Sequence, residues 1–458
     1  MARNWVGHGE VEELRRMAAS HFWPHGWQLH DLSEETAVIL VRRGRGVWVE
    51  DVEGKRWFDL MAGMWLVHIG HGRKEVAQAV HSQIREISHS PVGTVSPITV
   101  RLAATVAALA PDKQSRVYFV NSGSEAVEVA LRIARLYHTN RGEPARWKVM
   151  SRRGSSHGAT YACTGLGGGE MGVCAGSERL MRGNVYVAQP GSSCPYCQGK
   201  VSCTLECARD VEREVVHEDP LTVAAFIGEP ISVSAGIHVP HPDYWPTVRA
   251  ICSKYGILLI CDEVITGFGR TGRMFAMEHW GIAPDIIAVA KGLSSGYAPI
   301  GAAIVSKKIA DVCLADEGSA LGQVFTSGGN PASCAAALAN LEILQSERMV
   351  ENSAKMGTYL YGRLERLRRH PVVRDVRGGK GLLCAVEITG GGESKPPFSR
   401  QSNRWRTLNL IMRKHGLLGQ ATSIIPVAPS LCITKEEVDY LAMQLDQVIA
   451  EVASAPSV

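Results

Sequence analysis

Two residues of opposite charge, Asp262 and Lys291, each follow a short apolar run of the sequence. The runs are Ile257–Cys261 and Ile286–Ala290, and runs of this kind, bounded by glycine and proline, are typical of buried strands. Ligands of open α/β sheets bind beyond the carboxyl ends of the strands, so a carboxylate and an amine that leave neighbouring strands there would face one crevice. Taken alone, the two residues are better explained by an ion pair that closes the strand ends.

A junction between a strand and a helix, upstream of this pair, is a candidate anion site. The run SRVYFV predicts a strand over 115–120, and NSGSEAVEVALRIARLY predicts a helix over 121–137. Ser122, Gly123 and Ser124 lie at the junction, where free backbone N–H groups and the positive end of the helix attract an anion. A plain helix N-cap explains the same residues about as often.

The elements that must position these residues alternate in type along the chain. Strand and helix patterns follow one another from about Leu102 to Ser306, which predicts a mostly parallel sheet covered by helices. One of the strands, Ala224–Ile231, places Glu229 near its carboxyl end. This carboxylate would therefore join the other residues at the same edge of the sheet.

The remaining segments predict a second, smaller unit. The alternating run Val47–Leu60 turns at Glu53-Gly54 and predicts a hairpin. It is followed by a glycine-rich loop carrying Trp65, which either lines a pocket or packs in the core. We predict an N-terminal arm and hairpin (1–72) packed on a C-terminal small α/β domain (331–458), and a large domain between them (73–330).

The composition excludes several classes of function. The hydrophobic fraction is 45%, the charged fraction is 21%, and the net charge of +4 is spread over 458 residues without a basic tract, so a nucleic-acid partner is not expected. No apolar run approaches the ~18 residues of a membrane span, and the N-terminus has no secretory signal. Twelve cysteines, many within apolar runs, indicate buried thiols in a reducing, cytoplasmic compartment.

Four of the cysteines form a separate cluster. Cys194 and Cys197 are followed closely by Cys203 and Cys207, a spacing similar to that of zinc ligands, although the two pairs are nearer to each other than in common zinc modules. Reduced thiols on a surface insertion explain the cluster better than a structural metal, so no metal site is predicted.

Four segments together resemble the class III aminotransferases, pyridoxal-phosphate enzymes of fold type I. They are NSGSEAVEVALRIAR, IGEPI, DEVITGFGRTG with the lysine of AVAKGLSSGYAPIGA, and TSGGNPASCAAALAN. Their order and spacing fit the family, and the resemblance extends from Val47 over nearly all of the chain. It implies an α/β fold in which the large domain binds pyridoxal 5'-phosphate on a mostly parallel sheet and a smaller α/β domain covers it.

The resemblance also implies roles for single residues at the cofactor ring. Lys291 would form a Schiff base with the cofactor aldehyde and later move the proton of the reaction. Asp262 would pair with the pyridine nitrogen, so that the ring, lying between Asp262 and Lys291, acts as an electron sink. Val264 would pack on one ring face, and Glu229 would lie near the phenolate through a hydrogen-bond network with Asp262.

At the other end of the cofactor, the resemblance implies a phosphate site shared between two subunits. Ser122, Gly123 and Ser124 would hold the phosphate. Thr326, on a loop that reaches across the interface, would complete the phosphate site of the neighbouring subunit. The chain would therefore be a homodimer with shared active sites.

Two positions depart from the family pattern. Ser156 stands where the family usually carries a tyrosine that stacks on the cofactor, a contact worth about 0.5–1.5 kcal/mol. His157 or a residue from elsewhere would have to cover that face. Gln420 stands nearest to the arginine with which many relatives grip a substrate carboxylate, and it cannot supply a charged clamp. A nearby arginine could substitute: Arg404, Arg406 or Arg413.

These residues predict an ω-transaminase-like enzyme that works in a two-stage, ping-pong cycle. An amine or amino acid donor would give its amino group to the cofactor, and a carbonyl acceptor would take it up. With Trp65 and Gln420 at the substrate, one substrate is expected to lack a carboxylate, as an amine or an amino-sugar aldehyde does. Racemases, epimerases and aminomutases of the same family remain the alternative. A binding protein without activity is disfavoured because Lys291, Asp262 and the phosphate residues are all present.

Overall fold

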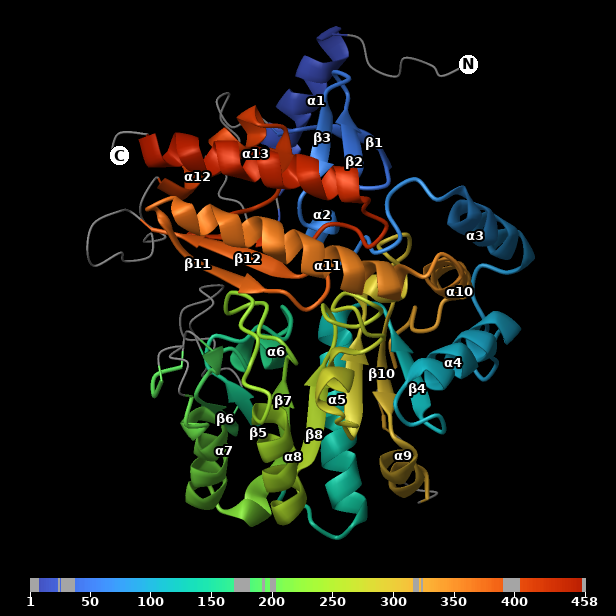
Figure 1. Ribbon diagram of the computed structural model, residues 1–458. Helices are drawn as coiled ribbons and strands as arrows, with labels where there is room; N and C mark the ends of the chain where they lie inside the picture. The colour runs from blue at the N-terminus through green and yellow to red at the C-terminus, as the bar shows by residue number, and fades with distance from the viewer. Residues whose placement is uncertain are drawn as a thin grey trace.

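The fold is built on three β-sheets with helices packed around them (Figure 1). It is known from a computed structural model that describes residues 8–23, 25, 38–168, 182–191, 194–197, 203–315, 321–322, 324–389 and 404–454. In Figure 1 the largest sheet lies in the lower half, and the N-terminal and C-terminal segments come together above it.

The large sheet has seven strands in the order β4-β10-β9-β8-β7-β5-β6. Strand β10 runs antiparallel to both of its neighbours, and the pairs from β9 to β6 are all parallel. The strands are β4 (Arg116–Val120), β5 (Lys148–Arg152), β6 (Asn184–Val187), β7 (Val223–Gly228), β8 (Leu258–Asp262), β9 (Ile286–Val289) and β10 (Gly301–Val305). The predicted mostly parallel sheet is therefore confirmed, with β10 as its reversed strand.

Both faces of this sheet are buried, as the apolar runs predict. Along β8, Leu258 and Ile260 pack in the cluster that contains α5 (Gly123–Asn140), whereas Leu259 and Cys261 pack in the cluster of α7 (Glu206–His217) and α8 (Tyr244–Tyr255). Alternate residues of a strand point to opposite faces, so a strand covered on both sides must be apolar throughout. The coverage leaves only the strand ends open for a site.

Of the two smaller sheets, the four-stranded one (β1-β2-β3-β13) joins segments from both ends of the chain, and the three-stranded one (β11-β12-β14) is built from C-terminal strands. The predicted hairpin forms from β2 (Trp48–Asp51) and β3 (Arg56–Asp59), and β3 then pairs in parallel with β13 (Leu417–Leu418). The other strands are β1 (Val41–Arg45), β11 (Val373–Gly378), β12 (Cys384–Ile388) and β14 (Ile424–Val427). The hairpin thus packs with C-terminal residues, although the domain boundaries at 72 and 330 remain a prediction.

The other helices surround these sheets. The long apolar helix α10 (Pro331–Ser346) packs on α3 (Lys74–Glu86) and α4 (Pro97–Leu109), and it also contacts α11 (Met349–Glu365). The other helices are α1 (His8–His21), α2 (Ala62–Trp65), α6 (Tyr161–Gly165), α9 (Lys307–Leu314), α12 (Arg404–Lys414) and α13 (Lys435–Ser454). Short 3-10 turns are η5 (Pro220–Thr222), η6 (Ala276–Trp280), η7 (Lys291–Leu293) and η8 (Arg366–Arg369).

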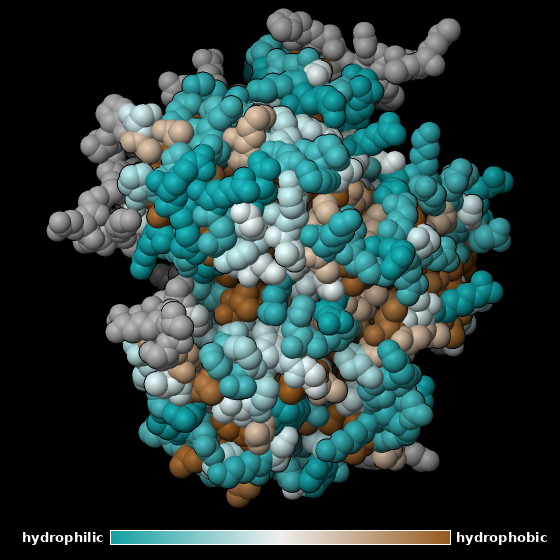
Figure 2. Space-filling model, viewed as in Figure 1, coloured by the Kyte–Doolittle hydropathy of each residue, from teal (hydrophilic) through white to brown (hydrophobic). Residues whose placement is uncertain are grey.

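The outer surface carries mainly polar side chains. On the face shown in Figure 2, hydrophilic residues surround small, scattered apolar patches. Among the described residues, no helix combines the length and the apolar character that crossing a membrane requires.

Candidate active site

A cavity of about 1090 Å³ opens at the carboxyl ends of the central strands. Residues that follow β4, β7, β8 and β9 line one side of it, and the segments 61–66 and 420–426 line the other. Eleven of the twelve site residues predicted from the sequence line this one cavity, namely Trp65, Ser122, Gly123, Ser124, Ser156, His157, Glu229, Asp262, Val264, Lys291 and Gln420. The twelfth, Thr326, does not line it and is exposed in the single chain.

Asp262 is buried at the end of β8 and is held by two hydrogen bonds. One carboxylate oxygen lies 2.7 Å from Nδ1 of His157, and the other accepts the backbone N–H of Val264 at 3.0 Å. Nε2 of the buried His157 ring has no hydrogen-bond partner in the structure. Asp262 is therefore fixed in position by His157 and pairs with it, rather than with Lys291 in the ion pair that would merely close the strand ends.

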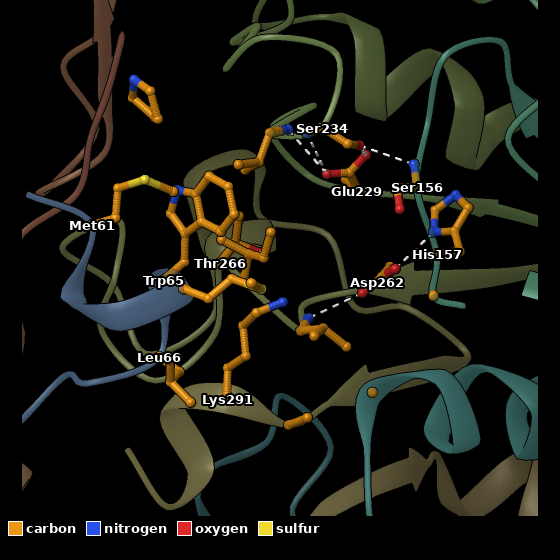
Figure 3. Close-up of a pocket in the computed structure, with 18 of the residues that line it drawn as sticks. Met61, Trp65, Leu66, Ser156, His157, Glu229, Ser234, Asp262, Thr266 and Lys291 are labelled. Carbon is orange, nitrogen blue, oxygen red and sulfur yellow. Dashed lines mark hydrogen bonds and ion pairs between the residues drawn. The ribbon is translucent and has the colours of Figure 1, made fainter. Parts of the chain in front are cut away.

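Lys291 enters the cavity from the first residue of η7 (Figure 3). Within the part of the chain that the structure describes, its amine has neither a hydrogen bond nor an ion pair. Burial lowers the pKa of Lys291, and the carboxylates of Asp262 and Glu229 offset part of that effect. A larger fraction of the amine is therefore neutral near pH 7 than in an exposed lysine, as a nucleophile or a base requires.

The backbone at Lys291 is strained, and the side chains of Asn340 and His68 hold the turn in place. Its φ of +33° lies in the left-handed region, which costs about 1–3 kcal/mol for a residue other than glycine. The side-chain amide of Asn340 donates to the carbonyl oxygens of Gly292 and Leu293, both at 2.9 Å. His68 packs so closely that a Cβ on Gly292 would lie 2.3 Å from its ring. Asn340 and His68 thus hold the turn that aims the amine.

Replacement of Asn340 by alanine should therefore impair both stability and turnover. Two buried carbonyl groups would lose their partner, at a cost of about 1–3 kcal/mol each, and a misplaced amine should lower kcat by roughly 10²-fold. Thermal unfolding and steady-state kinetics measure the two effects. Asn352→Ala is the matched control, because Asn352 also donates to two backbone carbonyls, those of Leu431 and Ile433, which do not belong to the Lys291 turn. An unchanged kcat in Asn340→Ala would show that Asn340 is not needed to position the amine of Lys291.

The start of α5 combines the two explanations that the sequence left open. Ser122 is the N-cap, and its hydroxyl accepts the backbone N–H of Glu125 at 3.2 Å. The N–H groups of Gly123 and Ser124 belong to the first helical turn, which leaves them without intrahelical acceptors. A Cβ on Gly123 would lie 2.8 Å from a methyl group of Val264, so glycine is needed for Val264 to approach the helix start. The same residues therefore cap the helix and can bind an anion.

Glu229 is connected differently from the prediction. Its carboxylate accepts hydrogen bonds from the hydroxyl of Ser234 and, at 3.0 Å, from the backbone N–H of Val233, and Ser234 in turn accepts the N–H of Ser156 at 2.9 Å. The hydrogen bonds thus run toward Ser156, and Asp262 acts on Glu229 through its charge. Burial is the main cause that raises the pKa of Glu229. The positive charges of His157 and Arg152 lower this pKa, and the negative charge of Asp262 raises it further.

The outer part of the cavity combines apolar and neutral polar side chains, and none of its described residues carries a guanidinium. Met61 and Trp65 line it (Figure 3) together with Trp405 and Gln420, and the backbone N–H of Gln420 lies 3.3 Å from the sulfur of Met61. Lys291 is the only lysine or arginine among the described residues that line the cavity. Arg406 lies over the Trp405 ring at 5.6 Å, Arg413 does not line the cavity, and the side chain of Arg404 lies outside the described residues. The described part of the chain therefore offers no clamp for a carboxylate.

The residues present fit the predicted cofactor. The anion-binding turn at Ser122–Ser124 suits its phosphate, and the carboxylate of Asp262 suits a protonated ring nitrogen. The unpaired amine of Lys291 suits its aldehyde. All three groups line one cavity, and the glycine at 123 lets Val264 lie against the start of α5, where a Cβ would lie 2.8 Å from its methyl group.

Comparisons with known proteins agree with these observations. The sequence pattern of the family described as aminotransferase class-III matches residues 30–449. A putrescine–pyruvate aminotransferase of Pseudomonas aeruginosa is 33% identical, with 98% of each chain covered, and a diaminobutyrate–2-oxoglutarate transaminase of Halomonas elongata is 34% identical, with 91% of each covered. The crystal structure of an (S)-enantioselective omega-transaminase from Thermomicrobium roseum is similar with a TM-score of 0.90 and 37% identity, over 96% of this chain and 98% of that one.

Proposed function

The chain belongs to the class III aminotransferases, which are pyridoxal-phosphate enzymes, and from this premise we propose that its amino donor is an amine without a carboxylate. The observation that carries the proposal is the absence of any arginine among the described residues that line the cavity. Gln420, the residue nearest to the arginine expected from the resemblance, is neutral. Apolar side chains such as Met61, Trp65 and Trp405 surround the place where the rest of the donor would lie.

We further propose which residues hold the cofactor. Ser122, Gly123 and Ser124 would bind the phosphate, Val264 would pack on the ring, and Asp262 would pair with the ring nitrogen. When bound, the cofactor withdraws electrons from the carbon that carries the amino group, which makes the hydrogen on that carbon acidic.

The chain's own side chains supply the proton transfer. Lys291 would bind the cofactor in the resting enzyme, and its Nζ would then take the proton from the substrate Cα and return it to the cofactor carbon. Burial has lowered the pKa of this amine, so it can accept a proton near neutral pH. His157, bound to Asp262 at 2.7 Å, would keep the Asp262 carboxylate oriented toward the ring.

A matched pair of donors tests the substrate class. Putrescine and ornithine differ by one carboxylate, and kcat/KM should favour putrescine because no described residue that lines the cavity is an arginine able to pair with desolvated carboxylate oxygens. We expect a preference of at least about tenfold, equivalent to about 1.4 kcal/mol. A preference for ornithine would contradict the proposal. Deuterium uptake at Cα without any carbonyl product would instead indicate racemisation or epimerisation.

Replacement of Gln420 by arginine should reverse this preference. A guanidinium at this position can form charge-assisted hydrogen bonds to a carboxylate, each worth about 1.5–3 kcal/mol, so kcat/KM for ornithine should rise roughly 10- to 100-fold. Gln420→Met is the matched control, because it keeps the length of the side chain without the charge. An equal rise in both variants would show that size, not charge, limits carboxylate substrates at this position.

We also propose that the enzyme is a homodimer in which Thr326 completes the phosphate site of the other subunit. Thr326 is exposed in the single chain and lies outside its cavity, in keeping with a role at a second cavity. Thr326→Ala should weaken cofactor binding by about 10- to 100-fold, since it removes a hydrogen bond to a charged group.

Mixing of subunits distinguishes a role of Thr326 at the neighbouring subunit's site from a role within its own subunit. In a heterodimer of Thr326→Ala and Lys291→Ala chains, one site would combine an intact Lys291 with an intact Thr326 from the neighbour. Mixing two impaired variants should therefore restore tight cofactor binding and activity at one site per dimer. If activity stays at the level of the parent variants, the sites are not shared through Thr326.

A further inference from the structure

Two cysteines of the insertion that follows β6 lie close enough to react with each other. The sulfur atoms of Cys197 and Cys203 are 3.9 Å apart. Cys203 is half-buried and Cys197 is 9% exposed, so solvent reaches the pair mainly at Cys203. Among the described residues, no group of three or more histidine, cysteine or acidic side chains has a geometry that could hold a metal ion.

We propose that Cys197 and Cys203 form a redox-active dithiol, which closes to a disulfide when the enzyme meets a low-molecular-weight disulfide such as oxidised glutathione. A disulfide has an S–S length of about 2.05 Å, so the two sulfur atoms must approach by about 2 Å. Only five residues separate the two cysteines in the sequence, so they remain near each other in either state.

A hydrogen bond next to Cys197 and a short chain connection from Cys203 place the two cysteines beside the same helix. Tyr196, the neighbour of Cys197, donates its hydroxyl to Asp210 of α7 at 2.6 Å, and Asp210 also accepts the N–H of Ala188 at 2.8 Å. Cys203 lies three residues before α7 begins at Glu206. Cys197 is thus connected to the first half of α7 through Tyr196, and Cys203 through the chain, in keeping with the 3.9 Å between their sulfur atoms.

The other two cysteines of the cluster are poorly suited to the same reaction. Cys194 and Cys207 are buried in the core, Cys207 in the first turn of α7, and burial is the main cause that raises the pKa of each thiol. Thiol–disulfide exchange needs the thiolate, and a raised pKa makes the thiolate scarce. The half-buried Cys203 is therefore the thiol expected to react first, with Cys197 as its resolving partner.

The reaction consists of two exchanges. The thiolate of Cys203 attacks one sulfur of the oxidised glutathione, which forms a mixed disulfide and releases one glutathione thiolate. The thiolate of Cys197 then attacks the Cys203 sulfur, which forms the protein disulfide and releases the second glutathione thiolate. The two protons lost by the cysteines end on the two glutathione thiols, and two electrons pass from the protein to glutathione.

Peptide mapping of the full-length holoenzyme tests the proposal. Trypsin cuts after Arg182, Lys200 and Arg209, so a disulfide between Cys197 and Cys203 joins the peptides 183–200 and 201–209. After incubation with oxidised glutathione and alkylation of the remaining thiols, the joined peptide should replace both single peptides, and dithiothreitol should reverse the change.

Single substitutions identify the sulfur atoms that react. The joined peptide should persist in Cys194→Ser and Cys207→Ser and disappear in Cys197→Ser and Cys203→Ser. Its absence from the wild-type enzyme, or its loss in the Cys194 or Cys207 variant alone, would overturn the proposal. One zinc ion per chain in enzyme purified without chelators, lost on substitution of any of the four cysteines, would overturn it as well.

Discussion

Replacement of Lys291 by alanine is expected to abolish turnover, with a loss in kcat of at least about 10⁴-fold, because the variant loses both the amine that binds the cofactor and the base that moves the proton. The amine is enclosed in the cavity and, among the described residues, has no structural partner that the substitution would leave unpaired. The fold should therefore survive. Steady-state kinetics, circular dichroism and sedimentation measure the two expectations.

Lys254→Ala is the control for this variant. Lys254 forms an exposed ion pair with Glu212 at 2.8 Å and lies outside the cavity, so its loss should leave kcat unchanged. A small primary amine added to the solution should restore part of the activity of Lys291→Ala, since it replaces the missing base. If Lys291→Ala keeps wild-type turnover, another residue moves the proton.

Replacement of Asp262 by asparagine is expected to have the second largest effect. The variant keeps the shape of the side chain but loses the charge that stabilises a protonated ring nitrogen, so kcat should fall roughly 10²- to 10³-fold. KM for the donor should change much less, because the role proposed for Asp262 is at the cofactor ring rather than at the substrate. His157 would also lose the anionic partner that it contacts at 2.7 Å.

The exposed Asp243→Asn variant is the control for Asp262, because Asp243 lies at the start of α8, outside the cavity. Activity and the absorbance spectrum of the bound cofactor should be followed together. A spectrum that changes along with kcat assigns the effect to the ring. A kcat unchanged in Asp262→Asn would contradict the pairing of this carboxylate with the cofactor.

The sequence predicted the elements around Asp262 and Lys291 closely. The expected strands 257–261 and 286–290 are observed as β8 (Leu258–Asp262) and β9 (Ile286–Val289), and the helix expected after Asn121 begins at Gly123. These elements are defined by local apolar periodicity and by glycine and proline at their ends, which a single sequence displays. Neighbouring parallel strands then bring their carboxyl ends to one edge without further information.

Residues that act through distant contacts could not be predicted in this way. Asn340 supports the Lys291 turn across 48 positions of the chain, and His68 reaches Phe268 across 200. Neither belongs to a motif, and the sequence around a single asparagine in an apolar helix does not indicate which carbonyl groups its side chain contacts. Ser234 was missed for the same reason, although its place five residues after Glu229 could have marked it as a local partner.

The apolar side of the cavity was only partly predicted. The sequence indicates Trp65 and Gln420 but not Trp405, because the arginines on either side of Trp405, Arg404 and Arg406, are the stronger candidates for contact with a carboxylate. Which face of α12 turns toward the cavity depends on how that helix packs on α13 and β13. Such packing depends on contacts between distant segments and cannot be read from a charge pattern.

The central claim is that this cavity transfers an amino group from an amine without a carboxylate, using Lys291. A single turnover of the purified pyridoxal-phosphate enzyme with putrescine, without acceptor, tests it most directly. The absorbance of the aldehyde form of the cofactor should be lost, with one carbonyl product per active site, and Lys291→Ala should show neither change. Persistence of the aldehyde absorbance with every carboxylate-free amine, alongside its loss with amino acids, would contradict the claim.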